Sequence, residues 1–144
     1  MPVTRRSAVV AAPPADVWRT VADPYMLPRW WPRVERVEGV GRGAFTQVLR
    51  SDRGATVRAD FRIALARRPT ELRWTQDLAG TPFAKLLRRA ETRIVLAPEG
   101  DGATRVEIAL DQKLAGTARL GGPLVRRATR RRLDEALAAL AAVF

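Results

Sequence analysis

Two glutamines are the residues of this sequence most suited to orienting a small molecule inside a protein. Gln76 lies two residues after Trp74, and Gln112 lies two residues after Leu110. Because residues two apart in a strand point to the same face, each amide shares a face with apolar neighbours. A buried amide must be hydrogen-bonded, or it costs about 1–3 kcal/mol in desolvation. The two amides therefore fit polar groups in an apolar ligand pocket. They fit equally well at strand ends that reach solvent.

Two arginines of the last segment could hold an anion. On a helical wheel Arg126 falls between Leu133 and Leu137, and Arg132 falls beside Val125, so neither belongs to the polar side. In one interpretation their stems cover apolar surface and their guanidinium groups reach water. In the other interpretation, one of the two arginines binds a carboxylate, enolate or phosphate in a cavity. We choose Arg126 for this role.

The composition of the 144 residues excludes several kinds of active site. There is no cysteine and no histidine, which removes disulfides, thiolates and His-activated nucleophiles, and leaves no plausible metal site. No paired carboxylates and no glycine-rich phosphate loop before a helix are present. We therefore expect no catalytic residue, no metal and no cofactor. If a substrate is turned over, Tyr25, Arg126 or a buried acid would have to move the proton.

The net charge of +11 fits either a solvated basic surface or a dedicated anionic partner. The 26 basic residues include only Lys85 and Lys113 as lysines, which indicates GC-rich coding, and they are spread along the chain. Arginines of the last helix could pair with Asp134 and Glu135, or dock on an anionic membrane or on nucleic acid. No apolar run approaches about 20 residues and no signal-peptide core follows Met1, so we expect a cytoplasmic protein.

Glycine and proline divide the chain into a strand, two short helices, a series of strands and a long helix. Residues 122–144, which begin with Gly-Pro and contain no later glycine or proline, form the long amphipathic helix. No βαβ repeat occurs, so the sheet is antiparallel and the chain forms one domain. The short helices are expected over residues 16–22 and 25–31, and residues 83–89 form a helical turn or a flap. The strands are expected over residues 4–10, 34–40, 44–50, 55–66, 71–77, 90–97 and 104–114.

Strict alternation in these strands predicts which side chains face the long helix. The same inward set fits a packed core or the lining of a ligand cavity, and both interpretations stay open. Of the adjacent Trp30 and Trp31, one anchors the short helices and the other reaches a cavity or the surface. The inward residues are Phe61, Ile63, Trp74, Ile94, Val106, Ile108 and Leu110, facing Thr129, Leu133 and Leu137.

The order of elements and several local stretches resemble the START-like helix-grip superfamily (SRPBCC), in its polyketide cyclase/dehydrase branch. The matching stretches are residues 9–18, 23–32, 96–98 and 102–106, together with the arginine-rich last helix. The resemblance implies an α+β fold in which a curved antiparallel sheet of about seven strands wraps around the C-terminal helix. It also implies an elongated apolar cavity between them for a lipid, polyketide, sterol or aromatic molecule.

We therefore expect a protein that binds a small hydrophobic or amphipathic molecule without turnover. A polyketide cyclase or dehydrase is the first alternative, and an interaction protein that docks an anionic partner through its last helix is the second. The sequence does not indicate an oligomeric state. The expected ligand-binding residues are Trp31, Phe61, Ile63, Trp74, Gln76, Ile94, Leu110, Gln112, Arg126, Thr129, Leu133 and Leu137.

Overall fold

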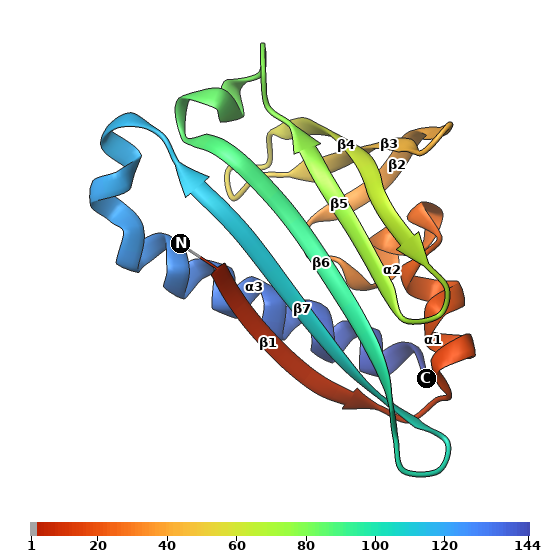
Figure 1. The fold of residues 1–144 in the computed structure, drawn as a ribbon. Helices are drawn as coiled ribbons and strands as arrows, with labels where there is room; N and C mark the ends of the chain where they lie inside the picture. Colours follow the sequence, from red (N-terminus) through yellow and green to blue (C-terminus); the bar gives the residue numbers. More distant parts are fainter. Residues whose placement is uncertain (1–2) are drawn as a thin grey trace.

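Seven antiparallel strands form one curved sheet in the protein, seen in a computed structural model that describes residues 3–144 (Figure 1). The strand order is β1-β7-β6-β5-β4-β3-β2, so each strand from β2 to β7 pairs with its neighbour in sequence and β1 closes on β7. The expectation about a signal peptide starts from Met1, and Met1 lies outside the described residues. The strands are β1 (Val3–Val10), β2 (Val34–Gly41), β3 (Ala44–Arg50), β4 (Thr56–Arg67), β5 (Glu71–Asp77), β6 (Leu87–Glu99) and β7 (Ala103–Leu114).

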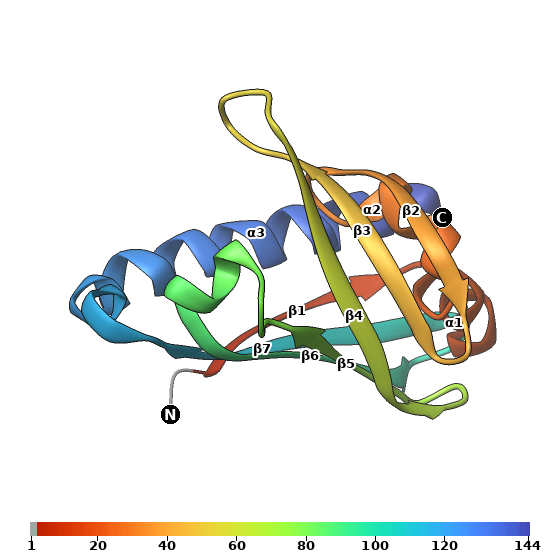
Figure 2. The ribbon, with the colours of Figure 1, turned by 90° about the horizontal axis from the view of Figure 1, so that it is seen from above.

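The long helix α3 lies along the concave face of this sheet. Figure 2 shows β4, β3 and β2 turning away from the plane of β1, β7 and β6, so that the sheet half-encloses α3. The short helices pack at the end of the molecule where α3 ends, and α2 contacts α3 directly. The helical segments are α1 (Pro14–Val21), η1 (Pro24–Met26), α2 (Leu27–Trp30), η2 (Pro82–Lys85), η3 (Gly116–Gly121) and α3 (Gly122–Val143).

The α+β helix-grip architecture predicted from the sequence is confirmed, and the largest difference is at the start of β6. The pattern predicts a strand from residue 90, after a flap, but β6 already begins at Leu87. The reason is a long-range partner: β6 pairs with β7 from Leu87 opposite Leu114 to Glu99 opposite Ala103. Only the first part of the expected flap is helical, as the single turn η2.

The core forms where the last three turns of α3 meet the sheet and the short helices. The face of α3 that carries Leu133, Leu137 and Leu140 is completely buried, in agreement with the wheel prediction. Each such leucine contributes about 1.5–3 kcal/mol by leaving water. Phe144 is partly exposed because it follows the last helical residue. Within residues 3–144, no helix combines the length and apolarity that a membrane span requires.

Glu71 is a carboxylate on the convex face whose contribution to stability depends on pH. Its Oε2 accepts hydrogen bonds from Nε of Arg73 at 2.6 Å and from Nε of Arg93 at 2.8 Å. The hydrogen bond from Arg93 lowers the pKa of Glu71 most, burial raises it, and the bond from Arg73 lowers it again. The net effect is a pKa below the usual value for glutamate.

Replacing Glu71 by glutamine is expected to cost about 1–3 kcal/mol of unfolding free energy at neutral pH, since two charge-assisted hydrogen bonds are weakened. Because the folded-state pKa is the lower one, the stabilisation is complete above the unfolded-state pKa of about 4.3 and is lost as pH falls through the folded-state pKa. Urea midpoints of the two proteins should therefore converge in acid. Glu99→Gln, which changes an exposed pair with Arg105, is the control and should shift the midpoint less. A loss that is the same at every pH would contradict this origin.

Candidate functional site

Four aromatic side chains form a cluster on the concave face of the sheet. Phe45 of β3 stacks on Phe61 of β4, with ring centroids 5.4 Å apart. Trp74 of β5 contacts Phe45 edge-on at 5.5 Å, and Trp31, which follows α2, contacts Trp74 at 5.5 Å. Both Trp30 and Trp31 are buried, so neither reaches the surface, and Trp31 is the one that joins the cluster. The cluster forms a rigid apolar wall on this part of the concave face.

A buried amide without a hydrogen-bond partner lies beside this wall. Gln47 pairs with Ala59 across β3 and β4, on the same sheet face as Phe45, and only 2% of its surface is exposed. Its Nε2 atom has no hydrogen-bond partner among the described residues. Buried polar groups are nearly always paired, because an unpaired one costs about 1–3 kcal/mol. Gln47 is thus a donor ready for an acceptor.

The two glutamines expected from the sequence occupy different positions on the concave face. Gln112 of β7 bridges sheet and helix, because the Thr129 hydroxyl of α3 donates to its Oε1 at 3.1 Å. Gln76 of β5 lies opposite Phe61, where the pairing of β5 with β6 has already ended at Thr75. Beyond that point the strands diverge, and a hollow of about 520 Å³ opens between them, lined by Gln76 and by residues from both sheet faces.

The remaining expected site residues divide into a buried group and a half-buried group. The half-buried ones lie on strands, toward the side of the concave face that faces the start of α3, whereas the helix residues of the set are buried. The inward side chains are therefore most buried around Leu133 and Leu137 of α3 and less buried on β4, on β5 and near the end of β7. The buried residues are Trp31, Trp74, Ile94, Leu110, Thr129, Leu133 and Leu137, and the half-buried ones are Phe61, Ile63, Gln76 and Gln112.

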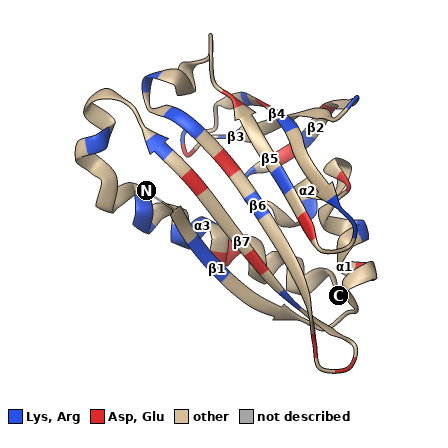
Figure 3. Cartoon of the chain, viewed as in Figure 1, with Lys and Arg blue, Asp and Glu red and all other residues tan. Residues whose placement is uncertain are grey.

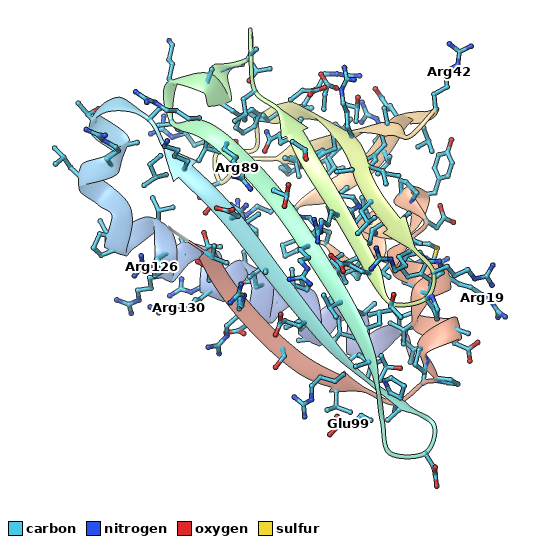
Figure 4. The ribbon with its side chains drawn as sticks, in the orientation of Figure 1. Arg19, Arg42, Arg89, Glu99, Arg126 and Arg130 are labelled. Atoms are coloured by element: carbon cyan, nitrogen blue, oxygen red, sulfur yellow. The ribbon has the colours of Figure 1, made fainter. Side chains whose placement is uncertain are left out.

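Arg126, chosen from the sequence as the anion-binding arginine, is exposed and projects away from the sheet together with Arg130 (Figure 4). Arg132 lies on the other flank of α3, close to Arg33. Desolvation by the surrounding protein and the charge of Arg33 lower its pKa, although the side chain keeps an exposed surface and stays charged at neutral pH. Arg132 forms no salt bridge with any residue from 3 to 144. Of the two arginines weighed from the sequence, Arg132 is the one that lies close to another element, at Arg33 in the turn between α2 and β2.

The sequence profile of the family described as polyketide cyclase/dehydrase and lipid transport matches residues 1–144. The chain belongs to this family. No curated protein matches it in sequence.

Solved structures of a START superfamily protein and of aromatase/cyclases share the fold described above. A START superfamily protein from Mycobacterium smegmatis is 16% identical with a TM-score of 0.80, and the match covers 97% of this chain and 94% of that one. The ZhuI aromatase/cyclase from Streptomyces sp. R1128 is 18% identical with a TM-score of 0.78, covering 97% and 91%. The di-domain aromatase/cyclase BexL of the BE-7585A biosynthetic pathway is 22% identical with a TM-score of 0.83, covering 99% of this chain and 46% of that one. These likenesses concern the fold.

Gln47 is absent from the ligand-binding residues that were expected from the sequence. It follows Phe45 by two positions, just as Gln76 follows Trp74, so the same alternation argument applied to it. The pattern was obscured because Val48 and Leu49 are both apolar and give β3 no clear polar face. Val48 is in fact completely buried on the convex side of the strand.

Proposed function

We propose that the protein binds a small amphipathic molecule, apolar along most of its length, on the concave face between β3–β5 and α3. The observation that carries this proposal is the buried Nε2 of Gln47, which has no partner and lies beside the aromatic cluster. A carbonyl, phenol or carboxylate oxygen of a ligand would supply the missing acceptor. The family description, which names polyketide and lipid chemistry, supports a ligand of this class.

The proposed function is binding without turnover, because the groups on the concave face are amides and hydroxyls. Gln47, Gln112 and Thr129 can orient a ligand but cannot exchange protons near neutral pH. Acidic residues of the strands lie on the convex face. Asp60 and Asp77, for example, are paired across β4 and β5, and each is next in sequence to a residue of the concave face, Phe61 and Gln76. Tyr25, considered from the sequence as a proton donor, has an exposed side chain.

Native mass spectrometry of the freshly purified protein tests this proposal. We expect a mass above that of the denatured chain, and extraction should release an amphipathic lipid or aromatic molecule. A titration with a fatty acid and with an aromatic carboxylate, followed by tryptophan fluorescence, covers the case in which the ligand is lost in purification. A ligand-free mass together with no response to either added compound would contradict the proposal and favour a concave face filled by its own side chains.

A further inference from the structure

Three exposed leucines lie at one end of the molecule. Leu86 follows η2, Leu120 belongs to η3 and Leu124 to the first turn of α3, and they expose 56%, 88% and 74% of their surface. The backbone N–H of Ala115 donates to the Leu86 carbonyl oxygen at 2.8 Å, which holds the two segments together. Figures 1 and 2 both show η2 and η3 at the end opposite the C-terminus. We refer to Leu86, Leu120 and Leu124 as the leucine end.

The charge around the leucine end has one sign. Residues 78–90 and 112–133 contain ten lysines and arginines and no aspartate or glutamate. Figure 3 shows this as blue without red along η2, η3 and the first half of α3. All ten are exposed, and only Arg89, which pairs with Asp111, forms a salt bridge with a residue that the structure describes. Of the nine unpaired cations, those within two positions of a leucine of the leucine end are Lys85, Arg88, Arg119 and Arg126.

Exposed leucines inside a set of unpaired cations match the chemistry of an anionic lipid surface. Apolar side chains gain free energy by entering the interfacial region of a bilayer, and nearby basic residues are attracted to its acidic headgroups. A nucleic acid would engage the cations but leave the three leucines in water, which is an arrangement without gain. The combination of the two features therefore favours a membrane.

We infer that the leucine end docks on anionic membrane surfaces. Leu86, Leu120 and Leu124 enter the interface, while the unpaired cations contact the headgroups. The docking is peripheral, in keeping with the absence of any membrane-spanning helix within residues 3–144. The docking itself does not depend on the proposed ligand.

Co-sedimentation with vesicles tests the inference in the full chain. The protein should bind vesicles of phosphatidylcholine with phosphatidylglycerol, and not vesicles of phosphatidylcholine alone. Each basic residue near an anionic surface contributes a factor of about five to binding, so Arg119→Gln with Arg126→Gln should weaken it about 25-fold. The charge-matched control is Arg19→Gln with Arg42→Gln, which Figure 4 shows at the other end of the molecule and which should bind nearly as the parent does.

The apolar contribution has its own matched pair of variants. Leu120→Ser with Leu124→Ser should weaken binding at least about tenfold, because the inserted surface is lost. Tyr25→Ser with Phe144→Ser removes two exposed apolar side chains elsewhere and should leave binding unchanged. All four positions are exposed, so circular dichroism should show a folded protein in each case.

A label placed at one residue reports which part of the molecule meets the bilayer. Because the chain has no cysteine, Leu124→Cys and Tyr25→Cys can each carry a polarity-sensitive fluorophore without a background signal. The emission at position 124 should shift to the blue on addition of anionic vesicles, and that at position 25 should not.

Three results would overturn the inference. The first is no binding to anionic vesicles even at low salt. The second is an equal effect of both arginine pairs, which would indicate general charge attraction. The third is a loss of binding to duplex DNA or to polyglutamate, but not to vesicles, when Arg119 and Arg126 are replaced. That result would assign the surface to an acidic macromolecule.

Discussion

Replacing Trp74 by alanine is expected to lower the free energy of unfolding by about 3–5 kcal/mol, the largest loss we predict for one residue. Trp74 is 2% exposed and is the centre of the aromatic cluster, in contact with Trp31, Phe45 and Phe61. Its removal takes away apolar burial and leaves a cavity that three rigid rings cannot refill. Urea unfolding followed by circular dichroism measures the loss, with the slope of the transition as a check on two-state behaviour.

Phe61→Ala is the matched control, since it removes another ring of the same cluster. Phe61 is only half-buried, so its removal should cost about 1.5–2.5 kcal/mol, roughly half the loss at Trp74. The same variant should weaken binding of any amphipathic ligand, because Phe61 is part of the aromatic cluster on the concave face. Equal losses of stability at the two positions would show that Phe61 is packed as core and that this region is closed.

Replacing Gln47 by leucine is expected to have the opposite effect on stability. Leucine has a similar size and no polar atom, so the variant should gain about 1–3 kcal/mol of unfolding free energy in the ligand-free protein. It should also lose about tenfold in affinity for a ligand that accepts a hydrogen bond from Nε2, as one hydrogen bond in a desolvated site is lost. The readouts are the urea midpoint of the stripped protein and a fluorescence titration with an aromatic carboxylate.

Gln112→Leu separates a glutamine with a ligand role from one with a structural role. The Oε1 of Gln112 already accepts a hydrogen bond from Thr129, whose side chain is buried. Its replacement should therefore destabilise the protein by about 1–3 kcal/mol, since the Thr129 hydroxyl is left unpaired. If Gln47→Leu instead destabilises the protein by a similar amount, the Gln47 amide is a satisfied structural group and the proposed function loses its main support.

The sequence alone determined those parts of the fold that depend on local patterns. The long helix followed from a run without glycine or proline that begins at Gly122 and has one apolar side. Strands β3 and β5 were predicted with their observed ends, because glycine, proline or charged turn residues bound them on both sides. The resemblance of the chain to the START-like helix-grip superfamily also rested on local stretches of sequence. Packing and hydrogen bonding within a few residues decide such features.

Only the tertiary structure decided the features that depend on distant partners. The start of β6 follows from its pairing with β7, and the inward position of Gln47 follows from its register with Ala59 of β4. The helical wheel placed Arg126 between Leu133 and Leu137 and Arg132 beside Val125, so it put neither on the polar side of α3. It could not show which flank meets β1, where Asp134 contacts Arg6, and which one faces Arg33. A pattern read along one segment contains no information about what packs against it, so the choice between these arginines required the assembled fold.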